Sequence, residues 1–227
     1  EILNQGYGGI KIYPLQKRTI DQAAICVSKI RKTLGFNIPL MLDLACPKDT
    51  NIPLKLAPLI EEFKPYWFEE PVDGEATRSL KYIKNQTGLR IVTGEKQCGI
   101  NHFIETLAVD AVDIFNPDIS SVGGIIDMIK IIELSNKNNV RVSPHCWNSM
   151  SIAASAMVHL CMSFPNTEMA EFFPEYIPYT LKFCNKNFEI NNGFIELENR
   201  EGLGVIIDTN LLMENTSSYK FSILDKN

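Results

Sequence analysis

Short apolar runs alternate with longer amphipathic segments along the first 173 residues of the chain. The short runs are almost continuously apolar, which is typical of strands buried on both faces of a parallel sheet. The longer segments repeat apolar residues at helical spacing, and Gly35 and Gly88 follow two of them as stop signals. The predicted strands cover residues 9–13, 38–44, 66–69, 89–93, 112–116, 140–143 and 168–172, and the predicted helices cover residues 19–34, 54–63, 76–86, 101–107, 124–136 and 151–162.

Seven predicted strands and six predicted helices in unbroken alternation favour an α/β fold of the (β/α) TIM-barrel type over a doubly wound open sheet. Neither GxGxxG nor GxxxxGK[ST], the phosphate loops of nucleotide-binding open sheets, occurs in the sequence. A complete barrel has eight strands. We therefore expect a barrel domain over residues 1–173 whose first strand is not in this chain, and residues 1–6 are typical of a helix end.

The strand–helix rhythm stops after residue 173. Residues 174–179 are rich in proline and polar residues, which indicates a loop. The Asn192-Gly193 step lies between two short apolar runs and predicts a β-hairpin, and a further strand is expected over residues 205–207. Residues 174–227 are therefore predicted to form a small C-terminal β extension that packs on the barrel.

Three carboxylates end successive predicted strands at an even interval, because Asp43, Glu69 and Glu95 follow one another at 26-residue steps. The carboxyl ends of barrel strands meet at one face, so the three side chains should converge there. An isolated acid at a strand end is more often a helix cap or a solvated charge. Three in successive units instead favour a site for a hard divalent cation such as Mg²⁺, which takes oxygen ligands.

Other strand ends also carry polar side chains that packing alone would not select. Asp118 lies one strand before His145, so its carboxylate could orient the imidazole and tune its charge as a general acid or base. Considered alone, His145 is equally consistent with a histidine in an ordinary loop. Lys11 alternates with apolar neighbours in its strand, which points its side chain inward. The full set at the strand ends is Lys11, Tyr13, Asp43, Glu69, Glu95, Asp118, His145 and Glu171.

The remaining polar and sulfur-containing residues are interpreted as structural. His102 and His159 fall in predicted helices, and the six cysteines form no CxxC pair, which indicates reduced thiols in a cytoplasmic protein. Glu70 should point away from Glu69 because neighbouring residues of a strand face opposite sides.

Composition excludes two classes of partner. The net charge is −5 and no basic stripe is present, which argues against nucleic acid. No apolar run approaches the roughly 20 residues of a membrane span, so no membrane partner is expected.

Several short motifs occur in a consistent order along the whole chain. They are GGIKIY at 8–13, MLD at 41–43, WFEEP at 67–71, TGE at 93–95, NPD at 116–118, GG at 123–124, SPHCW at 143–147 and GLGV at 202–205. Together they resemble the enolase superfamily, and within it the mandelate racemase/muconate lactonizing enzyme group. That resemblance implies Mg²⁺-dependent abstraction of the proton α to a carboxylate, through an enediolate intermediate. It also implies a homo-oligomer and a substrate-selecting N-terminal α+β capping domain, which is absent from this sequence.

The resemblance assigns a role to each strand-end residue. It implies that Asp43, Glu69 and Glu95 are the metal ligands. It implies that His145 is the general base or acid of a dyad with Asp118. Lys11 matches the first lysine of the Lys-x-Lys motif, in the catalytic and substrate-binding position, and Glu171 matches an acid that hydrogen-bonds the substrate carboxylate.

Two positions depart from the family pattern. Tyr13 replaces the second lysine of Lys-x-Lys, and Ala45 replaces an asparagine that often follows the metal aspartate. A phenol with a pKa near 10 is a poor base at neutral pH, so two-base racemisation is disfavoured, although Tyr13 could bind the substrate or donate a proton to it.

The leading interpretation is a sugar-acid dehydratase acting on an aldonate or aldarate, with His145 as its base. A cycloisomerase of a galactarolactone or an anhydrogalactonate is the second, because the HCW and EFFP segments resemble such members. A racemase or epimerase, and a catalytically inactive barrel that binds metal or sugar acid, remain as alternatives.

Overall fold

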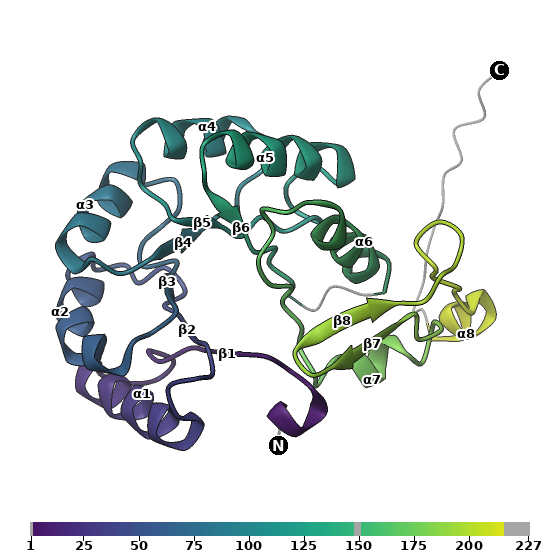
Figure 1. Cartoon of the computed structure of the whole chain (residues 1–227), viewed down its shortest axis with the longest axis horizontal. Helices are drawn as coiled ribbons and strands as arrows, with labels where there is room; N and C mark the ends of the chain where they lie inside the picture. The colour runs from purple at the N-terminus through teal and green to yellow at the C-terminus, as the bar shows by residue number, and fades with distance from the viewer. Residues whose placement is uncertain (1, 148–150, 216–227) are drawn as a thin grey trace.

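The computed structural model describes residues 2–147 and 151–215, and its central element is a six-stranded parallel sheet with the strands in chain order (Figure 1). Every neighbouring pair in this sheet is parallel, which confirms the α/β prediction. The strands are β1 (Ile10–Ile12), β2 (Leu40–Asp43), β3 (Trp67–Glu69), β4 (Ile91–Thr93), β5 (Ile114–Phe115) and β6 (Arg141–Val142).

Helices connect the strands and lie along the outer side of the arc that the sheet follows in Figure 1. Thr19 begins the first helix with a reciprocal capping box to Gln22, and Gly88 ends the third in the left-handed conformation at φ 64°. The helices are α1 (Ile20–Leu34), α2 (Asn51–Ile60), α3 (Thr77–Thr87), α4 (Asn101–Ala108), α5 (Ile125–Lys137) and α6 (Ser151–Ser163), with 3₁₀ turns η1 (Ile2–Gln5) and η2 (Glu61–Phe63).

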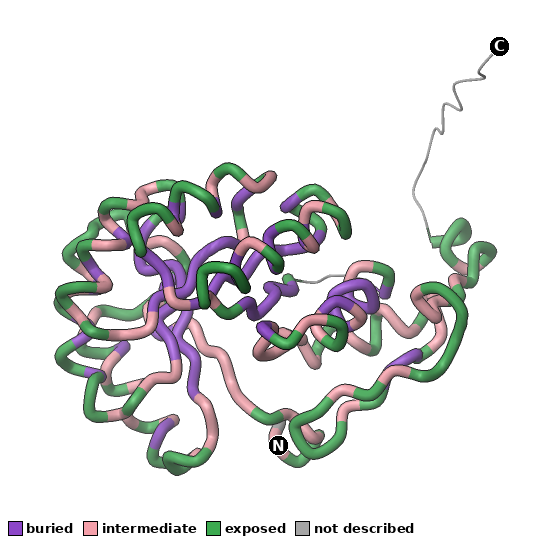
Figure 2. Tube along the Cα trace, turned by 45° about the horizontal axis from the view of Figure 1, so that its top comes forward, coloured by how far each residue is buried: buried purple, intermediate pink, exposed green. Residues whose placement is uncertain are grey.

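Both faces of the sheet are buried along β2 to β5, the purple strands at the centre of the molecule in Figure 2. Two clusters fill the space between the sheet and the helices, one around Phe68 under α1 to α3 and one around Phe115 under α4 to α6. A smaller cluster, which includes Met41, Trp67 and Ile114, covers the inner face. Burial on both faces explains why the strands are apolar without alternation.

Arg31, in α1, fixes the starts of two strands that carry site residues. Its guanidinium donates to the carbonyls of Ile38, just before β2, and of Phe63 and Lys64, just before β3. The side chain is 2% exposed, and its bonds satisfy carbonyls that would otherwise be buried without donors.

Beyond the sheet, the hairpin prediction is confirmed. Strands β7 (Phe188–Asn191) and β8 (Phe194–Leu197) pair antiparallel across Asn192 and Gly193, both of which have positive φ. The hairpin lies beside the N-terminal segment in Figure 1, where the Gly193 amide donates to the Gly6 carbonyl at 2.6 Å. Two short helices, α7 (Ile177–Thr180) and α8 (Thr209–Glu214), were not expected from the sequence.

Two of the strands predicted from the sequence do not form in the structure, so these predictions are wrong. Residues 205–207 make only one antiparallel bridge, between Ile207 and Cys184. Residues 168–172 form no strand; a single parallel bridge joins Thr167 to Val142, and the Glu168 amide donates to the Val142 carbonyl. An apolar run needs a paired neighbour to complete a ladder, and along 168–172 the described chain supplies only that short contact. Residues 216–227 of the predicted extension lie outside the described part.

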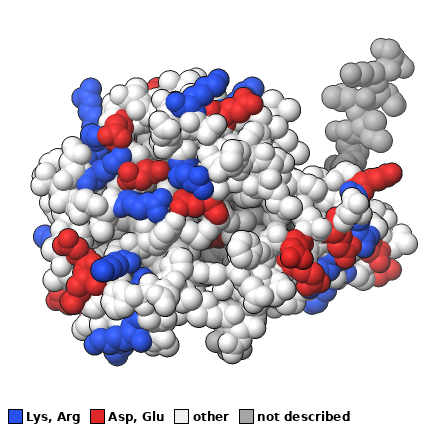
Figure 3. All heavy atoms as spheres, in the orientation of Figure 1, with Lys and Arg blue, Asp and Glu red and all other residues white. Residues whose placement is uncertain are grey.

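None of the helices in the described part of the chain combines the length and the hydrophobicity that crossing a bilayer would require. On the face shown in Figure 3, the described basic and acidic side chains are interspersed.

Candidate active site

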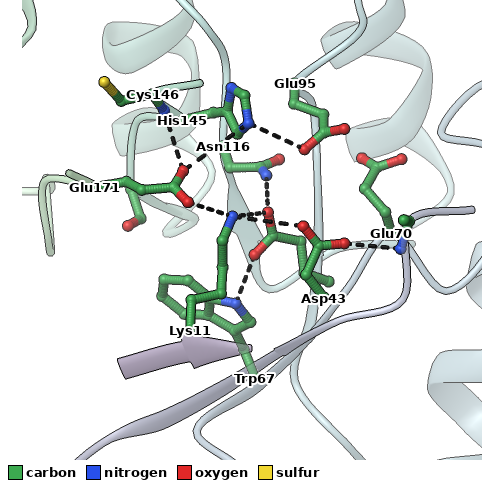
Figure 4. A network of polar contacts seen from close by, with 12 residues as sticks. Lys11, Asp43, Trp67, Glu70, Glu95, Asn116, His145, Cys146 and Glu171 are labelled. Atoms are coloured by element: carbon green, nitrogen blue, oxygen red, sulfur yellow. Dashed lines mark hydrogen bonds and ion pairs between the residues drawn. The ribbon is translucent and has the colours of Figure 1, made fainter. Parts of the chain in front are cut away.

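Asp43, Glu69 and Glu95 meet at the carboxyl ends of β2, β3 and β4 (Figure 4). The pairing of β2 with β3 sets Asp43 directly opposite Glu69, and Glu95 follows β4 by two residues. One oxygen from each carboxylate lies within 4.8 Å of the other two. Asp43 and Glu69 are 3% and 1% exposed. This buried donor set consists only of oxygen, which fits Mg²⁺.

Lys11, from β1, supplies positive charge to this cluster. Its Nζ lies 2.7 Å from Glu69 Oε1, 2.6 Å from Glu171 Oε1 and 3.6 Å from Asp43 Oδ2. Burial alone would lower the pKa of Lys11, but the facing carboxylates, Glu69 first, raise it well above its usual value. The side chain therefore remains a cation at neutral pH, in contact with three carboxylates.

Two residues that sequence reasoning missed orient Glu69. Trp67 Nε1 donates to Glu69 Oε2 at 2.9 Å, and Asn116 Nδ2 donates to Glu69 Oε1 at the same distance. The Asn116 Oδ1 atom is buried and has no hydrogen-bond partner among the described residues. The only available signal was spacing, since Trp67 and Asn116 each precede a predicted site residue by two positions and so share its face of the strand.

Asp118 and His145 form the hydrogen-bonded pair that their positions predicted. Their backbones form a parallel bridge, and His145 Nδ1 lies 2.8 Å from Asp118 Oδ2. A carboxylate can only accept, so Nδ1 carries the hydrogen and Nε2 is left with the lone pair in the neutral ring. That Nε2 faces the carboxylate cluster, 3.4 Å from Glu95 Oε2.

The dyad shifts both of its pKa values. Burial would raise the pKa of Asp118, but hydrogen bonds from His145 and from the Ser120 amide lower it overall. Burial would lower the pKa of His145, but the hydrogen bond to Asp118 and the charge of Glu171 raise it above its usual value. The imidazole is thus tuned as a stronger base than a free histidine.

Glu171 and Tyr13 border the same space. Glu171 Oε2 accepts from the Cys146 amide at 3.0 Å and lies 4.0 Å from His145 Nε2. Burial raises the pKa of the Tyr13 phenol above its usual value, with smaller opposing effects from the surrounding charges. Tyr13 is therefore a neutral phenol at neutral pH.

Glu70 points away from Glu69, as strand alternation predicts, and connects three strand ends. Its side chain is fully buried and accepts from Thr93 Oγ1 at 2.7 Å, from the Gly94 amide at 3.1 Å and from Cys46 Sγ at 2.9 Å. Its backbone has φ 42°, a left-handed conformation that is uncommon for a non-glycine residue. Glu70 therefore fixes the segments after β2 and β4, which carry two of the three clustered carboxylates.

Comparison with known proteins identifies the family. A family model described as "Enolase C-terminal domain-like" matches residues 1–211. This chain belongs to the enolase superfamily. Its relatives include D-galactonate dehydratase of Pectobacterium atrosepticum, 28% identical over 209 residues that cover 88% of this chain and 54% of the relative. The chain thus spans about half the length of the curated relatives that it matches.

Solved structures of the superfamily have the same fold. An enolase from the Sargasso Sea environmental genome superposes with a TM-score of 0.90 at 46% identity, covering 93% of this chain and 56% of that one. The 3,6-anhydro-D-galactonate cycloisomerase of Zobellia galactanivorans gives 0.86 at 30% identity, covering 93% and 59%. The L-talarate dehydratase of Polaromonas, solved with Mg and L-glucarate, gives 0.81 at 26% identity, covering 93% and 56%.

The carboxylate cluster predicts stabilisation by Mg²⁺. At a Mg²⁺ concentration one hundred times its dissociation constant, linkage adds about 2.7 kcal/mol to the free energy of unfolding. The measurement is the melting temperature with and without Mg²⁺. Asp43→Ala should abolish the increase, and Glu133→Ala, an exposed acid of α5, should retain it. A wild-type chain with no Mg²⁺-dependent shift would contradict the metal site.

The contacts of Glu70 lead to a second prediction, which concerns the affinity of the site for Mg²⁺. Glu70→Gln removes the charge that holds Thr93 and Cys46 while keeping the side-chain shape. Because residues that orient metal ligands typically contribute 10- to 100-fold to affinity, the dissociation constant for Mg²⁺ should rise about tenfold or more. Calorimetric titration of the folded variant tests this, with the exposed Glu62→Gln as the matched control. An affinity within twofold of wild type would show that Glu70 does not position the ligands.

Proposed function

We propose that this chain catalyses β-elimination from a sugar acid, with Mg²⁺ as cofactor. The leading reaction is dehydration of an aldonate or aldarate, and the second is ring opening of a cyclic sugar acid. The observation that carries the proposal is the single polarised histidine base, whose Nε2 faces a buried carboxylate cluster and a buried ammonium group. The dehydratase and cycloisomerase names of the relatives support the same class of reaction.

Substrate binding is assigned to the cationic side of the site. Lys11 would receive the substrate carboxylate as a charge-assisted partner, and Glu171, 2.6 Å from it, would orient that ammonium group. Asp43, Glu69 and Glu95 would hold Mg²⁺, which when bound supplies a Lewis acid for the charge that develops on the substrate carboxylate. Lys11 adds fixed positive charge at the same place.

Proton transfer is assigned to the dyad. His145 Nε2 would take the proton from the carbon α to the carboxylate, and Asp118 would stabilise the resulting imidazolium through Nδ1. The β carbon–oxygen bond then breaks, and the departing oxygen takes up a proton as water or as a freed hydroxyl group. The enol that remains tautomerises to a 2-keto-3-deoxy acid. Tyr13 has no amine to act as the second base of a racemase and would instead bind the substrate or donate a proton.

The architecture belongs to the same proposal. We infer that residues 1–173 form the barrel domain and residues 174–227 an extension that packs on it. The chain-order sheet and the Val142–Thr167 bridge support a sheet that continues in one direction. A cytoplasmic homo-oligomer remains the expectation from the sequence.

Incubation of the Mg²⁺-loaded chain with sugar acids and lactones in D₂O, followed by NMR, tests the reaction class. We expect a 2-keto-3-deoxy product, and His145→Asn should abolish its formation with the melting temperature unchanged. The control His159→Asn changes a histidine on α6, remote from the dyad in the sequence, and should stay active. Deuterium exchange with inversion and without elimination would instead indicate a racemase.

The raised pKa of His145 predicts a pH profile. The base must be unprotonated, so kcat/KM should rise with pH through a midpoint above the ordinary histidine value. Asp118→Asn removes the charge that favours the imidazolium, so the rising limb should move to lower pH by about one unit or more. The control Asp127→Asn, at a partly exposed acid of α5 paired with Lys130, should leave the profile in place. An unmoved limb in Asp118→Asn would exclude this coupling.

A further inference from the structure

Three aromatic side chains form a continuous group beside the candidate site. The rings of Tyr13 and Trp147 meet edge to face at a centroid distance of 6.3 Å and an interplanar angle of 84°. The rings of Trp147 and Phe173 meet in the same way at 4.8 Å and 77°. Edge-to-face contacts at these distances are favourable. We call Tyr13, Trp147 and Phe173 the aromatic rim.

The residues of the rim lie close in sequence to charged residues of the site. Each rim residue stands two positions after a site residue, namely Lys11, His145 or Glu171. In extended backbone, residues two positions apart face the same side and are offset by about 7 Å along the chain. Tyr13, which directly follows β1, therefore continues the side of Lys11 one layer further, and Trp147, which lies in a bend, joins Tyr13 and Phe173 through its two ring contacts.

The other side of the site has no such layer. The residues two positions after the clustered carboxylates are Ala45, Pro71 and Gln97. At this spacing, aromatic side chains thus follow Lys11, His145 and Glu171, on the side where the substrate carboxylate and its α carbon are assigned, and none follows the clustered carboxylates.

The rim also leaves a large apolar side chain accessible. Trp147 is 51% exposed, whereas Tyr13 and Phe173 are partly buried. An exposed indole next to a polar site is typical of a ligand contact, since binding sites combine aromatic walls with a few polar groups.

We propose that the aromatic rim selects cyclic sugar acids over open-chain ones. This rests on the proposed β-elimination and, of its two reactions, favours ring opening of a cyclic sugar acid over dehydration of an open-chain one. A sugar ring presents a face of C–H groups that can lie against the rim without losing hydrogen bonds. An open-chain acid presents hydroxyl groups along its length, and burying them against aromatic carbon without partners costs free energy.

Ring opening of a cyclic substrate neither consumes nor releases water. His145 Nε2 takes the α proton and the bond between the β carbon and the ring oxygen breaks. In an anhydro sugar acid that oxygen takes up a proton to become a hydroxyl group, and in a lactone it leaves as a carboxylate. The product is an isomer of the substrate. The open-chain acid gives the same 2-keto-3-deoxy acid by loss of water. A cyclic acid and its open-chain counterpart are therefore a matched pair whose affinities for the site can be compared.

The test measures binding in an inactive background. The His145→Asn chain, loaded with Mg²⁺, is titrated calorimetrically with 3,6-anhydro-D-galactonate and D-galactonate, and with D-galactarolactone and galactarate. We expect the cyclic member of at least one pair to bind about tenfold tighter, the size of one good aromatic contact. Adding Trp147→Ala should reduce that ratio to about one. Adding Trp147→Phe, which keeps an aromatic face, should retain most of it.

Several results would overturn the proposal. These are equal affinities within both pairs, an equal loss for cyclic and open-chain compounds in Trp147→Ala, and binding of none of the four. Melting curves establish that each variant is folded. Wild-type turnover distinguishes the two levels: if no compound is converted but the ratio behaves as expected, the reaction assignment fails while the rim is retained.

Discussion

The gathering of three carboxylates at one point is the constraint on which this site depends. Two unit charges at about 4 Å repel by roughly 4 kcal/mol at an effective dielectric constant of about 20, and burial together with the charges of Asp43 and Glu171 raises the pKa of Glu69 to about 8. Lys11, Trp67 and Asn116 offset part of this cost through Glu69. A bound divalent cation would offset far more. The fold thus holds an arrangement whose natural complement is a metal ion.

Parallel pairing explains how the sheet achieves this arrangement. Asp43 faces Glu69 because β2 and β3 are in register, and neighbouring residues of β3 serve opposite sides. Glu69 enters the cluster, while Glu70 bonds outward to Thr93 and Cys46. The end of β3 therefore supplies both a carboxylate of the cluster, Glu69, and the side chain that holds the neighbouring strand ends in place, Glu70. The positive φ of Glu70 is consistent with strain retained at a functional site.

Local patterns predicted the features that depend on local chemistry. The carboxylates, the dyad and the Asn192-Gly193 hairpin all follow from spacing or turn preference, and the structure places each group together. For the bonds of Trp67 and Asn116 to Glu69, the two-residue spacing was the only local signal, and it is weak because a tryptophan in a strand is equally typical of packing. Residues 168–172 and 205–207 have strand-like composition, but a strand also needs a partner, and pairing is a property of the whole fold.

The strand ends carry two layers of residues, the charged residues of the candidate site and, beyond them, the aromatic rim. In the proposal the first layer performs the reaction and the second selects the substrate. In the proposed reaction, proton removal would use Lys11, the Asp118–His145 dyad and the carboxylate cluster whichever oxygen departs, so these residues would not distinguish dehydration from ring opening. The distinction must come from what else contacts the substrate, and the next layer provides an aromatic surface on one side only. Tyr13 then has two parts in the proposal. It stands where a racemase of the family would carry its second base, and its ring belongs to the aromatic rim. Both features would disfavour inversion and favour elimination from a ring-shaped substrate.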